Sequence, residues 1–172
     1  VYLLDLEYTQ VHDVMMLSNV RVLNLNSTKV TDITLLGNVY DLNIANNNIN
    51  HEMLGNVHRL CITSQVSVIS MLGNIHTLIL CGNIDYCVSA LSKIHELNIS
   101  NTNTTDVSML GDLHDLNLNN THVRDVYMLS KVHILNLRTA YYVSNVMTLG
   151  NVHELNISIT NVVDVNALGN VY

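Results

Sequence analysis

One histidine recurs at the same point of successive sequence repeats, and histidine is the side chain best suited to chemistry near neutral pH. Imidazoles stacked in a row could hold a transition metal, or they could sense pH by changing charge together. Metal sites, however, gather several ligands around one point. We therefore interpret the row as a structural ladder, expect no metal ligand in it, and keep metal binding and pH sensing as alternatives. Its members are His58, His76, His95, His114, His133 and His153.

The residue after each histidine position is acidic in several repeats. These acids are Asp41, Glu96, Asp115 and Glu154, and the strip is interrupted by Arg59, Thr77 and Ile134. If neighbouring repeats lie side by side, Arg59 can pair with Asp41 across adjacent strands. An acidic strip on an open surface predicts a protein partner that carries basic groups, because complementary charge favours the encounter.

Neither the cysteines nor any sequence motif indicates enzyme chemistry. Cys61, Cys81 and Cys87 are odd in number and form no Cys-x-x-Cys pair, which argues against a disulfide framework or a zinc module. The chain has no Gly-x-Ser-x-Gly, no phosphate-cradling glycine loop and no carboxylate pair outside the periodic scheme. We therefore expect no catalytic residue, no cofactor and no enzyme activity. Free thiols favour a reducing compartment, so we expect a cytoplasmic location.

These residues are positioned by a repeat of about 19 residues. Counted from the apolar residue after each Gly-Asn or its variant, successive repeats are 18 to 20 residues apart. Such a short, regular period is typical of a solenoid. We expect one domain over residues 1–172, with about nine repeats and both ends cut within a repeat, as in a fragment of a longer protein. The repeats begin at residues 1, 20, 39, 57, 75, 94, 113, 132 and 152.

Each repeat has room for one strand and one short helical turn. Apolar residues occupy positions 1, 4, 6, 11, 14 and 17, and those at 4 and 6 flank a polar residue, as in a strand with one buried face. An aspartate at position 13 is expected to accept an N–H at the start of a 3₁₀ or single α-turn. We expect Gly at position 18 to end that turn in the left-handed conformation, and Thr at position 9 to bond the backbone.

Two further rows have simple structural interpretations. The asparagines at position 5 point off the open face of the sheet, where they either bond one another or form a polar surface for a partner. Methionine at position 16 is expected to fill space in the core. The asparagines are Asn24, Asn43, Asn98, Asn117, Asn136 and Asn156, and the methionines are Met16, Met71, Met109 and Met128.

Specificity should lie where the repeats deviate from one another. In the fourth and fifth repeats Cys61 and Ile79 replace the position-5 asparagine, and the eighth repeat has an extra residue near Tyr141 and Tyr142. Adjacent tyrosines are good interface anchors, although one of them could instead fill the slot between strand and outer turn. The predicted partner-binding residues are Arg59, Cys61, Thr63, Thr77, Ile79, Cys81, Glu96, Asp115, Tyr141 and Tyr142.

Composition narrows the class of partner. The 172 residues are 48% hydrophobic and carry a formal net charge of −7, with no basic stripe, so we expect a folded chain that does not bind nucleic acid. No apolar run is long enough for a membrane-spanning helix.

The order Val-x-x-Leu-x-Leu-x-x-Thr-x-Val-x-Asp-Val-x-x-Leu is similar to the leucine-rich repeat. Its second half resembles the internalin type, whose units are longer and usually carry Asn at position 9. The resemblance implies an α/β solenoid: a right-handed superhelix with a concave parallel sheet that binds a protein, short 3₁₀ turns on the convex side and, since those turns are small, shallow curvature.

The Leu-Gly-Asn-Val-His wording also resembles repeat arrays of giant viruses of amoebae, which implies an intracellular array that binds host or viral proteins. We expect a protein-interaction scaffold. Two alternatives stay open: a substrate-recognition arm of a larger protein such as a ubiquitin-ligase adaptor, and a structural or surface array that self-associates, forming oligomers through uncapped ends.

Overall fold

A computed structural model of the chain describes residues 1–45, 47, 49, 54, 56–63, 72, 75–82 and 91–171. It consists of two compact units, Val1–Cys81 (unit 1) and Gly82–Tyr172 (unit 2). Each unit is a solenoid in which one strand from every turn joins a parallel sheet, as the repeat predicts.

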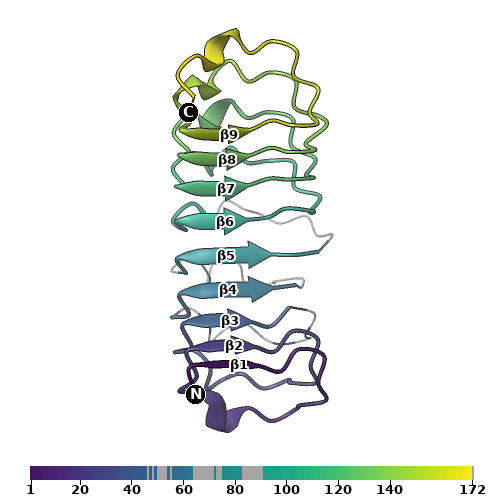
Figure 1. Cartoon of the computed structure of the whole chain (residues 1–172), viewed down its shortest axis with the longest axis vertical. Helices are drawn as coiled ribbons and strands as arrows, with labels where there is room; N and C mark the ends of the chain where they lie inside the picture. Colours follow the sequence, from purple (N-terminus) through teal and green to yellow (C-terminus); the bar gives the residue numbers. More distant parts are fainter. Residues whose placement is uncertain are drawn as a thin grey trace. The chain divides into compact units, whose positions relative to one another are not determined.

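In unit 1 the strands pair in chain order, as Figure 1 shows. The register places equivalent repeat positions opposite one another, so that Leu23 faces Leu42 and Leu42 faces Leu60. The strands are β1 (Leu3–Asp5), β2 (Val22–Asn24), β3 (Asp41–Asn43), β4 (Arg59–Ile62) and β5 (Thr77–Leu80).

Unit 2 repeats the arrangement with four strands of three residues each, again parallel and in register. They are β6 (Glu96–Asn98), β7 (Asp115–Asn117), β8 (Ile134–Asn136) and β9 (Glu154–Asn156). In both units the second residue of each strand is directed inward. The predicted core positions 1, 4, 6, 11, 14 and 17 hold the buried apolar side chains of the inner turns.

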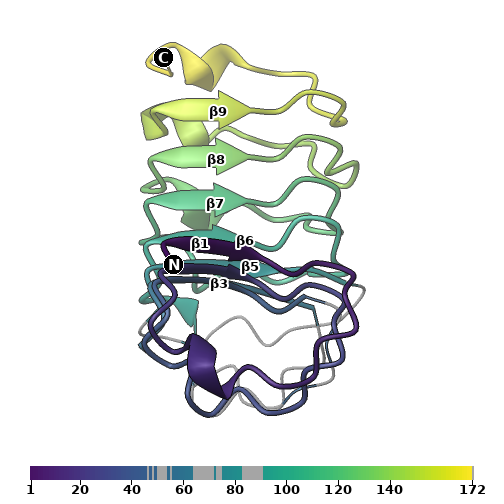
Figure 2. The ribbon, with the colours of Figure 1, turned by 60° about the horizontal axis from the view of Figure 1, so that its bottom comes forward.

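In some of the described turns a short 3₁₀ helix lies on the far side from the sheet, which Figure 2 shows for η1 in unit 1. They are η1 (Met15–Leu17), η4 (Tyr127–Leu129), η5 (Leu149–Asn151) and η6 (Asn166–Leu168). The predicted role of the position-13 aspartate is confirmed, since Asp125 Oδ1 accepts the N–H of Tyr127 at 3.1 Å and Asp13 accepts that of Met15 at 3.0 Å. Hydrogen bonds from Thr34 and Ser108 lower the pKa of Asp32 and Asp106 in the same way.

The predicted role of the position-18 glycine is wrong. Among the described glycines only Gly82 has a positive φ, and Gly169 ends η6 with φ −61°. Gly111 and Gly150 are needed instead for close packing, because a Cβ there would collide with the backbone carbonyl of Met128 or Ala167 in the next turn. The sequence pattern is the same for both roles, so only the stacking of turns distinguishes them.

In the turns whose position 8 the structure describes, the left-handed residue is at that position, directly before the position-9 residue. Tyr8, Ser27, Asn101, Asn120, Thr139 and Ile159 all have φ between 54° and 60°, and Gly82 has φ 110°. This bend brings the position-9 hydroxyl back to the strand, where Thr28 donates to Leu25 O at 2.8 Å and Thr102 to Ile99 O at 2.7 Å. The predicted backbone bond of the threonines is therefore confirmed.

The prediction that the position-16 methionines fill the core is wrong for the three that are described. Met16 is 92% exposed, and Met109 and Met128 are exposed as well. A single 3₁₀ turn directs positions 14 and 17 inward, and positions 15 and 16 are then left on its outer side. Met71 lies outside the described residues. In the described part of the chain no helix is long and apolar enough to span a membrane.

Candidate functional site

The position-5 asparagines end the strands and do not simply form a row of mutually bonded amides. The side-chain oxygen of Asn117 accepts the N–H of Asn119, two residues further along, at 3.0 Å. The same bond recurs at Asn24, Asn43, Asn98, Asn136 and Asn156, with lengths of 3.0 to 3.1 Å. Because the bond turns the chain away from the sheet, these strands have three residues each.

The fourth and fifth turns differ, because Cys61 and Ile79 cannot make this bond. Their strands β4 and β5 have four residues and add a fourth register pair, Ile62 with Leu80. Arg59 Nη1 reaches Asp41 Oδ1 at 2.9 Å across the β3–β4 pair, which confirms the predicted ion pair. Replacing asparagine thus changes both the length of the strands and the chemistry of the face.

The histidine row forms the predicted ladder within each unit. In unit 2 the ring centroids of successive histidines from His95 to His153 are 4.5 to 4.8 Å apart. In unit 1 Tyr40, His58 and His76 are stacked at 4.5 Å, and Arg21 places its guanidinium 4.5 Å from the Tyr40 ring. The pairs His95–His114 and His133–His153 are stacked, and the rings of His114 and His133 are tilted by 44°.

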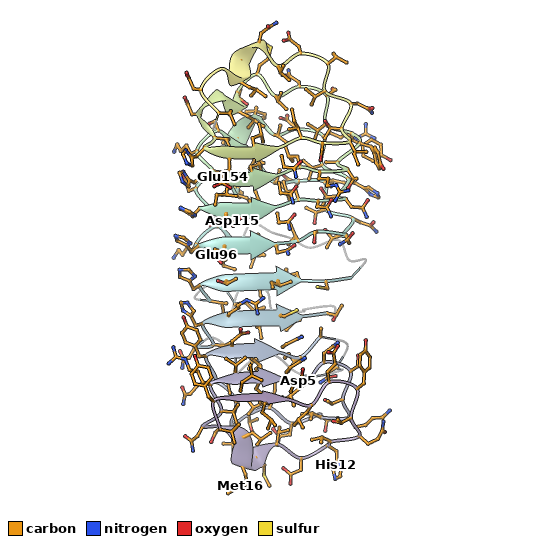
Figure 3. The ribbon with its side chains drawn as sticks, viewed as in Figure 1. Asp5, His12, Met16, Glu96, Asp115 and Glu154 are labelled. Atoms are coloured by element: carbon orange, nitrogen blue, oxygen red, sulfur yellow. The ribbon has the colours of Figure 1, made fainter. Side chains whose placement is uncertain are left out.

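Acidic side chains follow the histidines along the open face of unit 2, where Figure 3 shows Glu96, Asp115 and Glu154 on one side of the sheet. The register sets Ile134 on β8 between Asp115 on β7 and Glu154 on β9. Burial raises the pKa of Asp115, and the negative charges of Glu96 and Glu154 raise it further, although His114 and His95 act in the opposite direction. In the part of unit 2 that the structure describes, no lysine or arginine forms an ion pair with Asp115 or Glu154.

A shallow groove lies at the β8–β9 end of this strip. It has a volume of about 480 Å³ and is lined by residues 134–136 of β8, by His153 and by residues 154–156 of β9. The lining combines the apolar side chain of Ile134 with the carboxylate of Glu154 and the imidazole of His153. Ile134, His153 and Glu154 were not among the predicted binding residues, although the interruption of the acidic strip by Ile134 is visible in the sequence.

The two tyrosines of the eighth turn lie away from the sheet. Tyr141 and Tyr142 are both about half exposed, and the slot between strand and outer turn is filled by Ala140 and Val143. The alternative that a tyrosine fills that slot is therefore wrong. The Tyr142 ring contacts the edge of His122 at 5.5 Å between centroids and receives the Arg124 guanidinium at 4.9 Å.

The predicted binding residues fall into three groups. Six belong to the longer strands of unit 1 and the residues just after them, two belong to the acidic strip of unit 2, and the tyrosines form a separate group on the outer loops. The six are Arg59, Cys61, Thr63, Thr77, Ile79 and Cys81, and the two are Glu96 and Asp115. Cys87 lies outside the described residues.

Each unit has the fold of leucine-rich-repeat proteins. Solved structures with this fold include an internalin from Listeria monocytogenes, which matches with a TM-score of 0.71 and 20% identity over 99% of this chain and 59% of that one. Internalin C2 of the same organism matches with a TM-score of 0.63 and 21% identity, over 98% of this chain and 76% of its own. The functional domain of InlJ, also from that organism, includes a cysteine ladder and matches with a TM-score of 0.64 and 16% identity over 95% of this chain and 45% of its own.

The chain thus spans 59% of the length of the first of these structures. No protein-family model and no curated protein sequence matches the chain. Identities of 16% to 21% establish the fold alone. The resemblance to arrays of giant viruses therefore remains a prediction.

Proposed function

We propose that this protein is a non-catalytic interaction scaffold that binds a protein segment carrying lysine or arginine on the open face of the unit 2 sheet. The observation that carries the proposal is the position of Ile134 between Asp115 and Glu154 on three adjacent strands. Leucine-rich repeats, which the sequence resembles, use the same face of the sheet for protein binding.

The groove on β8 and β9 suits a long basic side chain. The aliphatic stem of a lysine or arginine packs on Ile134, while its charged end reaches the carboxylates on either side. Asp115 favours such a ligand in particular, because burial and the neighbouring acids disfavour its ionised form. A bound cation offsets both effects, so part of the binding energy comes from relieving repulsion that exists in the free protein.

The test measures binding of a fluorescent arginine-rich peptide by anisotropy, with an acidic peptide of equal length as the negative probe. Asp115→Asn is expected to weaken binding about fivefold, the effect of losing roughly 1 kcal/mol from one exposed charge pair. Ile134→Arg supplies a cation from the protein itself and is expected to weaken binding more. Raising the salt concentration weakens it as well, because exposed charges are screened.

Asp112→Asn is the matched control, since it removes one negative charge from unit 2 at an exposed residue that pairs with Lys131 at 3.2 Å. Equal losses for Asp112→Asn and Asp115→Asn would mean that only net charge matters, and the proposed site would then be abandoned.

The other two functions inferred from the sequence call for different measurements. A self-associating array requires oligomers of the isolated chain, which light scattering detects, whereas a scaffold that binds a separate partner does not. A substrate-recognition arm uses the same groove and differs only in what is attached to the chain. The peptide experiment therefore applies to it unchanged.

A further inference from the structure

Cys61 and Cys81 place two thiols on the same face of neighbouring strands. Cys61 lies on β4 opposite Ile79 of β5. Cys81 is the first residue after β5 and lies two residues beyond Ile79 in the chain. Leu60, Ile62, Leu78 and Leu80 alternate with them and are buried, so both cysteines are directed to the open face, where each is partly exposed. A hydrogen bond joins the two thiols.

The backbone holds this offset in place. Cys81 N donates to Ile62 O at 2.9 Å, and Ile44 N donates to Cys61 O at the same distance. A two-residue offset along strands about 4.8 Å apart separates the Cα atoms by about 8 Å in a regular sheet. A disulfide requires the two Cα atoms to be about 7 Å apart or less. A bond between these cysteines would therefore break the backbone hydrogen bond from Cys81 N to Ile62 O.

We propose that Cys81 is a site of reversible modification, at which its thiolate forms a mixed disulfide with a small-molecule disulfide while Cys61 acts as a positioning residue that donates a hydrogen bond to the thiolate. This site is separate from the basic-segment groove of unit 2 and does not depend on it. The residue after Cys81 is Gly82, which adds no side chain beside the sulfur.

The acidity of the pair agrees with this assignment of roles. The hydrogen bond from Cys61 lowers the pKa of the Cys81 thiol to about 7, although burial acts against it. The same bond, together with burial, raises the pKa of Cys61. Cys81 is therefore the nucleophile and Cys61 keeps its proton, the division of labour by which thiol pairs are activated elsewhere.

The exchange consumes no other reagent. The Cys81 thiolate attacks one sulfur of the disulfide R–S–S–R, the S–S bond breaks, and R–S⁻ leaves and takes a proton from water. The products are Cys81–S–S–R and R–SH. In an ordinary thiol pair the second thiol would then attack Cys81 and release R–SH again. The two-residue offset opposes that step, so the mixed disulfide is expected to persist.

The test uses the whole chain with Cys87→Ser, so that only Cys61 and Cys81 can react. Glutathione disulfide is the probe. Intact-mass and peptide-mapping mass spectrometry are expected to locate one glutathione on Cys81, with none after Cys81→Ser. The pH–rate profile should have its midpoint near pH 7, the pKa of Cys81. Cys61→Ala should move that midpoint toward about 8.5, the ordinary value for cysteine. At pH 6 the rate should fall about fivefold, since the higher nucleophilicity of a less acidic thiol offsets part of the lost thiolate.

Cys61→Ser is the conservative variant, because its hydroxyl still donates a hydrogen bond, and it should keep the midpoint near that of the parent. Circular dichroism and thermal unfolding check that each variant is folded. Should Cys61→Ala fail to fold, the parent profile decides, because a midpoint at 8.5 would overturn the proposal. A product that has lost two hydrogens without gaining glutathione would overturn it too, as would a failure of Cys81 to react.

Discussion

The pair β4–β5 of unit 1 and the strands β6–β9 of unit 2 are built from the same repeat and present different surfaces. In unit 2 every position-5 residue is asparagine and the strands have three residues each. Among the residues of unit 2 that the structure describes, no lysine or arginine pairs with the carboxylates of Asp115 and Glu154. In β4–β5 position 5 is Cys61 or Ile79, the strands have four residues, and the face carries a paired arginine and two thiols.

The residue at position 5 sets both the length of the strand and the chemistry of its open face. The side-chain oxygen of asparagine at position 5 accepts the backbone N–H two residues later, so this residue shapes the turn and is partly committed to it. Where asparagine is absent, the strand continues and a side chain with its own chemistry takes the place. The turns with asparagine at position 5 thus present a uniform surface, and the fourth and fifth turns present the two thiols.

The largest expected effect concerns position 8, the left-handed residue. The exceptional fifth turn has Gly82 there with φ 110°, while the ninth turn has Ile159 with φ 60°. Gly82→Ala is expected to destabilise the protein by about 2 kcal/mol, because a Cβ is strained at that φ. Ile159→Asn should stabilise it by about 1 kcal/mol, because a β-branched residue is poorly suited to the left-handed region and asparagine tolerates it.

Chemical denaturation of the two variants measures both changes. Asn101 and Asn120 already adopt this conformation at the equivalent position of other turns, with φ 59° and 54°, which supports the choice of asparagine. Changes of opposite sign in the free energy of unfolding would confirm that position 8 suits glycine or asparagine better than a β-branched residue. Destabilisation by Ile159→Asn would show instead that Ile159, which is 54% exposed, contributes packing that outweighs its backbone strain.

An intermediate effect is expected from removing the position-5 side chain. Asn117→Ala deletes the bond to the N–H of Asn119 and should cost about 1 kcal/mol, the usual contribution of one hydrogen bond. Cys61→Ala removes a partly exposed thiol that makes no such bond and should cost less. Urea unfolding at one pH compares them, and equal losses would contradict the structural role assigned to asparagine.

Much of this architecture could be predicted from the sequence, because the repeat period and the alternation of Leu23 and Leu25 around Asn24 are local patterns. The ion pair of Arg59 with Asp41 followed from the register alone. What could not be predicted depends on how turns stack: Gly150 is required by the carbonyl of Ala167 in the next turn, and Met16 is exposed because the outer turn is only three residues long. The groove beside Ile134 likewise requires β8 and β9 to lie side by side.

The smallest expected effect compares the position-3 carboxylates. Asp41 has Arg59 as its partner, so Asp41→Asn should destabilise the protein by about 0.5 kcal/mol, a typical value for a pair that is still partly exposed to solvent. Asp115→Asn should do the opposite at neutral pH. The folded state raises the pKa of Asp115, so it holds the proton more tightly than the unfolded chain does, and ionised Asp115 opposes folding.

That penalty is fully present above the raised pKa of Asp115 and disappears as the pH falls through it toward the unfolded value of about 3.9. The stabilisation by Asp115→Asn should therefore be largest near pH 7, remain below about 1 kcal/mol because the site is partly solvated, and vanish below pH 4. Thermal unfolding of the parent and both variants across this range measures it. A difference between Asp115→Asn and the parent that persists unchanged at pH 3.5 would show that the effect is not electrostatic. The contrast between a paired and an unpaired carboxylate at the same repeat position would then have to be abandoned.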